Sequence, residues 1–251
     1  MKQRAAPAIR GNIMVHEEIN KIEKEQCEES GRMKLSALAL MLQDVADHQL
    51  TPLSLRGYDI MKEGYMWVLV KRYMELKRFP REGEELKFYT WTAPARHGFC
   101  PRRYRVETLS GERVLDTVCQ WVVIDMKERG MVAPPEFVDR LPNGKMEGEL
   151  KMPKMPRDWP ELDHSKEKQA VAEDIDANGH VNNSRYLAWA MEIWEEHFGK
   201  EKEPGKIMIE YTKEVMQGEV LNLRYAADAE SLHLRGEHDG NTNFSIIMKL
   251  A

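Results

Sequence analysis

The sequence has few cysteines and no long apolar run, and these shortages exclude several classes of protein. Its three cysteines, Cys27, Cys100 and Cys119, are far apart, and no CxxC pair is present. An odd number of cysteines at such spacings argues against a disulfide framework and against a zinc site. No apolar run approaches the roughly 18 residues that a membrane-spanning helix needs. We therefore expect a protein of the reducing cytoplasm that does not associate with membranes.

A strong excess of one charge is also missing, because the formal net charge is -5 over 251 residues. This mild acidity disfavours non-specific binding to nucleic acid. The N-terminal stretch MKQRAAPAIRGNIMVHEE is basic but has no apolar core, so it is not predicted to be a secretory signal. The length suits one large domain or two small ones.

What the sequence does contain is an internal repeat. The segment MELKRFPREGEELKFY at 74–89 aligns with IEYTKEVMQGEVLNLR at 209–224, and Gly83 then matches Gly218 at an offset of 218 − 83 = 135. Each copy is typical of a strand, a tight turn and a second strand, which predicts a hairpin in each. Alone the match is weak, since short amphipathic segments resemble one another by chance.

The order of elements around the two copies supports a duplication. The segments 35–50 and 182–198 carry apolar residues at helical spacing, which predicts a long helix before each copy. Two more strand-like runs follow each copy, joined by Ser-Gly at 110–111 and by Asp-Gly at 239–240, and both dipeptides favour hairpin turns. Each half is thus predicted to have a long helix and four antiparallel strands, with room for one more strand before the helix. This is an α+β arrangement.

The stretch between the halves has a different composition. Residues 143–169 are rich in Pro, Lys and Glu and show no periodicity, which predicts an interdomain linker. The expected organisation is therefore an N-terminal unit at 1–142, this linker, and a C-terminal unit at 170–251.

The stretch DIDANGHVN directly before the second helix places an acid, an amide and an imidazole at alternate positions. One interpretation is a calcium loop, with Asp174, Asp176 and Asn178 as the first ligands. The bidentate Glu that such a loop needs is replaced by Arg185, which disfavours calcium. A second interpretation is a helix cap, in which an Asn or Ser at 182–184 accepts from the free amides of the helix.

A third interpretation is the polar half of an active site. Alternate residues of an extended segment point the same way, so Asp176, Asn178 and His180 are expected to converge beside the helix N-terminus. An imidazole, an amide and oriented N–H groups can stabilise an oxyanion. Glu214 falls opposite Phe79 at the offset of 135. The apolar Val215 and Met216 follow it and are expected to shield it from water, so it is a candidate general base. The alternative for Glu214 is a solvated edge residue.

These residues resemble those of the acyl-acyl-carrier-protein thioesterases of plants and bacteria. The hallmark of that family is similar to Asp-x-Asn-x-His-Val-Asn-Asn, found here at 176–183, and a second family segment, Glu-Tyr-x-x-Glu-Cys, is matched at 210–215 except at its last position. The likeness runs from about residue 12 to the C-terminus and includes WVVIDMKERGMVAPPE. The resemblance implies a tandem double hotdog, in which each half wraps a curled antiparallel sheet around its long helix.

The resemblance also implies an activity, the hydrolysis of fatty acyl-acyl-carrier-protein thioesters to free fatty acid and holo-carrier protein, without a metal or other cofactor. Val215 stands where the plant pattern has a cysteine, so the attack is assigned to water. In that mechanism Glu214 takes the proton, His180 and Asn178 hold the carbonyl oxygen, and Asp176 positions both. Which of Glu214, His180 and Asp176 is the base stays open.

The resemblance leaves several further questions open. The acyl chain is expected near the first helix, around Leu38, Met41 and Leu42. An acidic carrier protein would need a basic docking patch, and seven residues are candidates: Arg96, Arg102, Arg103, Arg105, Lys151, Lys154 and Arg157. A homodimer is compatible with the sequence. Two other functions stay open: another hotdog enzyme, either an acyl-CoA thioesterase or a dehydratase, and a non-catalytic acyl-binding protein.

Overall fold

The computed structural model describes residues 15–132 and 135–251. Most of the N-terminal stretch for which the sequence predicts no secretory signal, residues 1–14, lies outside this range. Within the described ranges, none of the helices combines the length and the apolar character that a membrane crossing requires.

The two long helices form where the apolar spacing predicts them. Helix α1 spans Leu35–Leu50 and helix α3 spans Asn183–Phe198. Each buries one face against the sheet, and Leu38 and Leu187 on these faces are fully buried. Complete burial of such a side chain contributes roughly 1.5–3 kcal/mol. The two helices also contact each other, so the two halves share one core.

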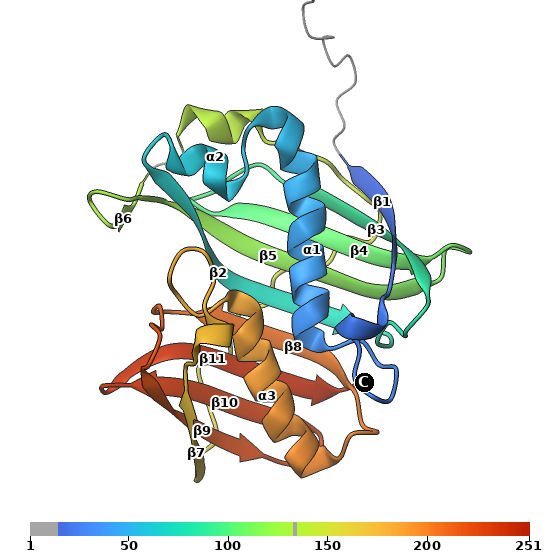
Figure 1. The fold of residues 1–251 in the computed structure, drawn as a ribbon, viewed down its shortest axis with the longest axis vertical. Helices are drawn as coiled ribbons and strands as arrows, with labels where there is room; N and C mark the ends of the chain where they lie inside the picture. Colours follow the sequence, from blue (N-terminus) through green and yellow to red (C-terminus); the bar gives the residue numbers. More distant parts are fainter. Residues whose placement is uncertain (1–14, 133–134) are drawn as a thin grey trace, which may run out of the picture.

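All ten main strands form one continuous antiparallel sheet in the order β1-β3-β4-β5-β2-β8-β11-β10-β9-β7 (Figure 1). In the first half the strands are β1 His16–Lys21, β2 Tyr65–Leu76, β3 Glu85–Thr92, β4 Cys100–Thr108 and β5 Arg113–Asp125, and the short β6 Gly130–Met131 pairs with β5. In the second half they are β7 His164–Gln169, β8 Pro204–Tyr211, β9 Val220–Ala227, β10 Ser231–His238 and β11 Asn241–Leu250. Figure 1 shows α1 against the first set of strands and α3 against the second, which is the expected double hotdog.

Short helical turns connect these elements. They are η1 Lys24–Gln26, η2 Thr51–Leu53, α2 Gly57–Met61, η3 Glu136–Arg140 and η4 Ala172–Asp174. Two of them, η2 and α2, lie between α1 and β2 in the first half, whereas α3 in the second half runs almost directly into β8.

The seam between the halves confirms the offset of the repeat. Strands β2 and β8 pair across the seam, and Tyr73 lies directly opposite Met208. The difference 208 − 73 is 135, so each residue faces its own counterpart in the repeat. The two halves are therefore related by a pseudo-twofold axis that crosses the sheet at this residue pair.

The prediction that the two strands of each repeated segment pair as a hairpin is wrong. Strand β2 pairs with β5 and β8, and β3 pairs with β1 and β4, so β2 and β3 are not neighbours. The same holds for β8 and β9 in the second half. Both edges of β2 and of β8 are occupied by other strands, so the glycine turns lead the chain across the end of the sheet. The Ser-Gly and Asp-Gly turns do close hairpins, between β4 and β5 and between β10 and β11.

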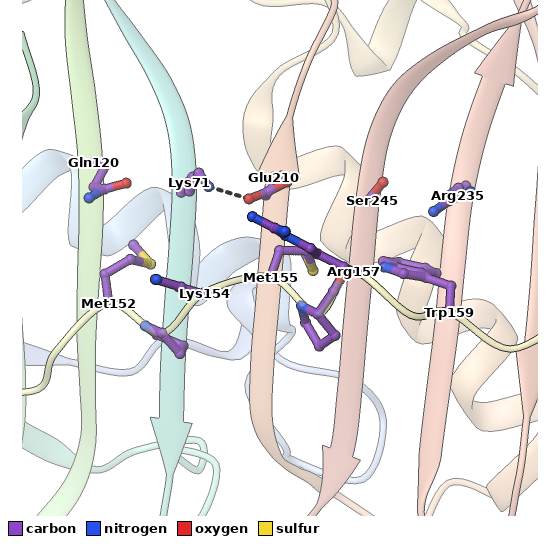
Figure 2. A pocket seen from close by; sticks show the side chains of 12 residues that line it. Lys71, Gln120, Met152, Lys154, Met155, Arg157, Trp159, Glu210, Arg235 and Ser245 are labelled. Carbon is purple, nitrogen blue, oxygen red and sulfur yellow. Dashed lines mark hydrogen bonds and ion pairs between the residues drawn. The ribbon is translucent and has the colours of Figure 1, made fainter.

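The stretch 143–169 contains a strand as well as a connection. Its last six residues form β7, which pairs with β9, so the first strand of the second half begins at His164 rather than after 169. The sequence HSKEKQ is polar at every position and has no apolar alternation that would reveal a strand. The earlier part of the stretch crosses the sheet on the face opposite the helices (Figure 2).

Candidate active site

The stretch 175–181 folds as a tight turn, so the expected extended geometry is wrong. Ile175 and Val181 pair as a bridge, and the carbonyl of Asp176 accepts a hydrogen bond from the N–H of Gly179 at 3.0 Å. Gly179 has a φ of +86°, a conformation that favours glycine. The Asp176 carboxylate also accepts from the backbone N–H of Asn178 at 2.8 Å, which is the side-chain bond typical of aspartate in turns.

His180 follows this turn, and its side chain contacts Glu214. Nε2 of His180 lies 3.2 Å from a carboxylate oxygen of Glu214. The backbone of His180 pairs with that of Met216, and the N–H of Val181 donates to the carbonyl of Val215 at 2.8 Å. These backbone contacts fix the loop against the segment after β8. The structure therefore brings together two of the four expected site residues from segments 34 positions apart.

Glu214 is more exposed than its apolar neighbours indicate. Its side chain is 49% exposed, whereas that of His180 is 21% exposed. Of the two apolar residues that follow Glu214, Val215 is fully buried in the core and Met216 is exposed. The expectation that apolar neighbours shield Glu214 from water is thus wrong, and its carboxylate contacts His180 from a half-exposed position.

A residue that the sequence did not reveal holds the Glu214 backbone. Asn243 on β11 is buried, and its Nδ2 donates to the carbonyl of Glu214 at 3.1 Å. Its own carbonyl accepts from the N–H groups of Thr212 and Lys213. The local signal that could have drawn attention to it is an Asn directly before the largely apolar run of β11, since a buried amide needs polar partners.

The start of α3 confirms the cap interpretation for Asn182. Its side-chain oxygen accepts from the N–H of Ser184 at 2.9 Å. The hydroxyl of Tyr211 donates to the carbonyl of Asn183 at 3.1 Å and fixes β8 to the helix. Asp174 is buried and paired with Arg185, so the first ligand of the calcium interpretation is already engaged by a cation. Capping and a role in the site are therefore compatible.

Asp176 and Asn178 face a cavity of about 510 Å³. This volume lies within the usual range for small-molecule sites. The second half contributes residues 176–178 together with Asn182 and Asn183, and the first half supplies the remaining walls. Those walls come from α1, α2, the ends of β2 to β5 and Leu141: Gln43, Ala46, Asp47, Leu50, Arg56, Gly57, Tyr58, Met61, Met66, Trp67, Thr92, Cys100, Arg102, Tyr104, Trp121 and Leu141.

The expected acyl-chain residues lie elsewhere on α1. Leu38, Met41 and Leu42 are buried in the shared core and do not line the cavity. The last two turns of the helix line it instead. His180 and Glu214 are also absent from the lining, although Asn178 is only two residues from His180. The four expected catalytic residues therefore form two pairs, Asp176 with Asn178 at the cavity wall and His180 with Glu214 beside it.

The three cysteines are all buried. Burial raises the pKa of the Cys100 thiol to about 11, although this residue lines the cavity. The pKa of Cys27 is also raised by burial. A thiol attacks as its thiolate, so raised pKa values disfavour both as nucleophiles.

The four arginines of the expected docking patch at 96–105 do not form a surface patch. Arg102 and Arg105 are buried, and Arg105 pairs with Asp116. Arg103 lies 3.7 Å from Glu149, and only Arg96 is exposed. Successive residues of a strand point to opposite faces of the sheet, so Arg102 is buried in the molecule and Arg103 lies on the opposite face. A count of charges along the sequence could not show this. The linker cations Lys151, Lys154 and Arg157 are exposed as expected.

Known proteins match this chain over most of its length. Residues 14–141 match the family described as the acyl-ACP thioesterase N-terminal domain, and residues 161–249 match the acyl-ACP thioesterase C-terminal domain. An acyl-[acyl-carrier-protein] hydrolase of Cuphea viscosissima, FATB2, chloroplastic, is 25% identical over 184 residues, which are 69% of this chain and 44% of that protein. The chain thus spans less than half of that relative.

Solved structures share the fold. An acyl-ACP thioesterase from Bacteroides thetaiotaomicron superposes with a TM-score of 0.84 at 18% identity, covering 95% of this chain and 98% of that one. The 12:0-ACP thioesterase from Umbellularia californica gives 0.78 at 17% identity, covering 97% and 99%. At these identities the likeness establishes the double hotdog architecture.

Proposed function

This chain belongs to the acyl-ACP thioesterase family, and on that premise we propose that it hydrolyses fatty acyl-acyl-carrier-protein thioesters. The observation that carries the proposal is the contact between His180 and Glu214 at 3.2 Å, beside a cavity lined by Asp176 and Asn178. A non-catalytic acyl-binding protein would have little use for two such polar pairs. The products are a free fatty acid and the carrier protein with its free thiol.

In the proposed reaction water attacks the thioester carbonyl carbon. Glu214 accepts the proton of this water, and the Asn178 amide and His180 hold the oxygen as it becomes an oxyanion. The N-terminus of the 16-residue helix α3, capped by Asn182 at the cavity wall, adds a partial positive charge. Collapse of the tetrahedral intermediate breaks the C–S bond, and the departing thiolate takes up a proton.

The two remaining polar contacts have a positioning role in this mechanism. Oδ2 of Asp176 lies 3.5 Å from Nδ2 of Asn178, and its other oxygen holds the Asn178 backbone, so Asp176 limits the directions in which the amide can point. The backbone N–H of Asp176 donates to the carbonyl of His180 at 2.9 Å. Asp176 therefore acts on both residues through the turn.

The proposed docking site for the acyl carrier protein is a cationic groove on the sheet face opposite the helices. Four cations line this groove of about 490 Å³: Lys71, Lys154, Arg157 and Arg235. Glu210, paired with Lys71, is the one carboxylate that the described residues contribute to the lining (Figure 2). The guanidinium of Arg235 lies 4.5 Å from the ring centre of Trp159, which orients the linker. An acidic carrier domain is attracted to such a surface.

The activity is tested by mixing the protein with matched acyl-carrier-protein and acyl-CoA thioesters and measuring free thiol and free fatty acid. We expect faster hydrolysis of the carrier-protein substrate. Equal or faster use of acyl-CoA would assign the chain to another hotdog branch. Conversion of an enoyl or hydroxyacyl thioester without thiol release would favour a dehydratase, and no turnover of any kind would favour a binding protein.

The docking surface has its own test. The double substitution Lys154→Glu with Arg157→Glu is expected to raise KM for the carrier-protein substrate about tenfold and to leave hydrolysis of acyl-pantetheine unchanged. Lys127→Glu, an exposed site on the turn between β5 and β6, is the matched control. Equal KM values for the double variant and the control would remove the groove from the proposal. The cytoplasmic location and a homodimer stay predictions of the sequence; the Cuphea relative is chloroplastic by name.

A further inference from the structure

The cavity wall formed by the first half is more polar than an alkyl chain requires. The strand register places Thr92, Arg102 and Trp121 on one face of the sheet. Arg102 on β4 lies opposite Thr92 on β3. Trp121 on β5 lies opposite Cys100, which is two residues before Arg102 on β4 and therefore on the same face. Diagonal neighbours on a sheet face are within reach of long side chains. Arg102 and the Trp121 side chain therefore lie on the same wall of the cavity.

Arg102 is buried in this wall and is not neutralised by a carboxylate. It is only 4% exposed, and among the described residues no carboxylate forms an ion pair or a hydrogen bond with it. Both of its side-chain hydrogen bonds in that part of the chain use Nη1, to Gln49 at 2.7 Å and to the Thr90 hydroxyl at 3.0 Å. Its Nε and Nη2 have no such partner, and the residue lines the cavity. A guanidinium carries five N–H donors, so most of them stay available to a ligand.

Two further groups complete the polar wall. Nε1 of Trp121 is buried without a hydrogen-bond partner among the described residues. Asp47 lines the cavity from α1. It lies close enough to Arg102 to feel its positive charge, but the two form no ion pair among the described residues. Burial raises the pKa of Asp47, which reflects its partial removal from water. The cavity thus offers both donors and an acceptor.

We propose that this cavity selects an acyl chain that carries a hydroxyl group, with Arg102 as the specificity-determining residue. A hydroxyl oxygen accepts from Nε or Nη2 of Arg102, and its proton can be donated to Asp47. A plain alkyl chain would cover these groups without satisfying them, which is unfavourable. A carboxylate on the chain would meet the charge of Asp47, so a neutral hydroxyl fits the wall better.

This inference rests on the proposed function for the identity of the substrate, but its test does not depend on turnover. Dissociation constants are measured by calorimetry for free fatty acids of equal length, with no hydroxyl or with one at successive carbons. The ratio kcat/KM is measured for the corresponding carrier-protein thioesters. We expect at least about tenfold tighter binding and a similar gain in kcat/KM for one hydroxyl position.

Variants locate the selectivity in Arg102. Arg102→Met is expected to remove the preference for the hydroxylated chain, and Arg102→Lys, which keeps one charged donor, to reduce it. Arg103→Met is the matched control, because Arg103 is the next residue on β4, is outside the cavity lining, and bonds to the carbonyl of Leu150. The control should keep the wild-type ratio.

Equal or tighter binding of the plain chain at every position tested in the wild-type protein would overturn the inference, and this result needs no variant to fold. An unchanged ratio in folded Arg102→Met would overturn the role of Arg102. Selective binding of hydroxylated acids without any thioester hydrolysis would support the polar wall and reject the proposed function.

Discussion

The loops that precede the two long helices have the same backbone and different side chains at the equivalent positions. Residues 27–33 form a bridge between Cys27 and Met33, just as 175–181 form one between Ile175 and Val181, so the two loops correspond at an offset of 175 − 27 = 148. Each has a glycine at positive φ, Gly31 and Gly179, in the equivalent place. The offset is 148 before the helices and 135 after them. It differs because the first half has additional residues, including η2 and α2, between its helix and the next strand.

At this offset Arg32 is the counterpart of His180, and their neighbours correspond as well. The guanidinium of Arg32 lies 5.4 Å from the ring centre of Phe79, and His180 meets Glu214, which is the counterpart of Phe79 at the offset of 135. The same two positions thus touch in both halves. In one half they hold a buried cation on an aromatic ring, and in the other an imidazole beside a carboxylate.

The two residues also differ in the charges around them and in their exposure. Arg32 is 2% exposed, pairs with Glu28 in its own loop and with Glu195 on α3, and donates to the carbonyl of Lys200. It therefore fastens the first half to the second. His180 has one carboxylate partner and partial access to water. We infer that duplication kept one loop as a structural joint and left the other free for chemistry.

The largest effect on activity is expected from a substitution in the second loop. His180→Ala should lower kcat about 10²–10⁴-fold, because it removes the imidazole that Glu214 faces. Stability should change by no more than about 0.5 kcal/mol, since the side chain is partly exposed. Steady-state kinetics and thermal melting measure both. His164→Ala, an exposed histidine on β7, is the control and should leave kcat unchanged.

The converse change on the first loop should affect stability and spare catalysis. Arg32→Met leaves two carboxylates near the core without their cation, and we expect a loss of about 3 kcal/mol in the free energy of unfolding. Turnover of the folded fraction should stay within about threefold, a change of less than 1 kcal/mol. Urea titration checks the first value. Arg81→Met removes an exposed pair with Glu203 and should cost less than about 1 kcal/mol.

A smaller effect is expected at the support of the Glu214 segment. Asn243→Ala removes the donor to the Glu214 carbonyl, and a slightly misplaced carboxylate should lower kcat about tenfold, or 1.4 kcal/mol, with KM little changed. Asn241→Ala, on the exposed start of the same strand, should have no such effect. If KM rises and kcat is unaffected, Asn243 supports substrate binding and not the placement of Glu214.

The smallest effect is expected from the cysteines. Replacing all three with Ala or Ser should keep kcat within about tenfold. With the pKa of Cys100 at about 11, only about one molecule in a thousand carries its thiolate at pH 8, so thiol-blocking reagents should react slowly. Alkylation followed by mass spectrometry measures this rate. An acyl group trapped on any cysteine would contradict attack by water.

Local signals predicted the parts of the molecule that depend on neighbouring residues. Apolar spacing located both long helices, and the motif at 176–183 located the loop whose His180 meets Glu214. The order of the strands could not be predicted, because pairing between β2 and β8 joins segments far apart in the chain and leaves no local pattern. The turn at Gly179 also depends on a side-chain hydrogen bond, which overrides the alternation expected for an extended segment.

Burial in the first half was equally hidden from the sequence. The run of arginines at 102–105 reads as a surface patch, yet strand alternation and the end of α1 bury Arg102 in the cavity wall. Asn243 lies 29 positions from Glu214, and only the pairing of β8 with β11 brings the two segments together.

The most direct test of the central claim, that chemistry belongs to the second loop and its carboxylate, is the turnover of Glu214→Gln on a carrier-protein thioester. This change keeps the size of the side chain and removes its basicity. We predict normal folding, unchanged substrate binding, and hydrolysis at least about a hundredfold slower than in the unaltered protein. Turnover close to normal would contradict Glu214 as the base and would transfer that role to His180 or Asp176.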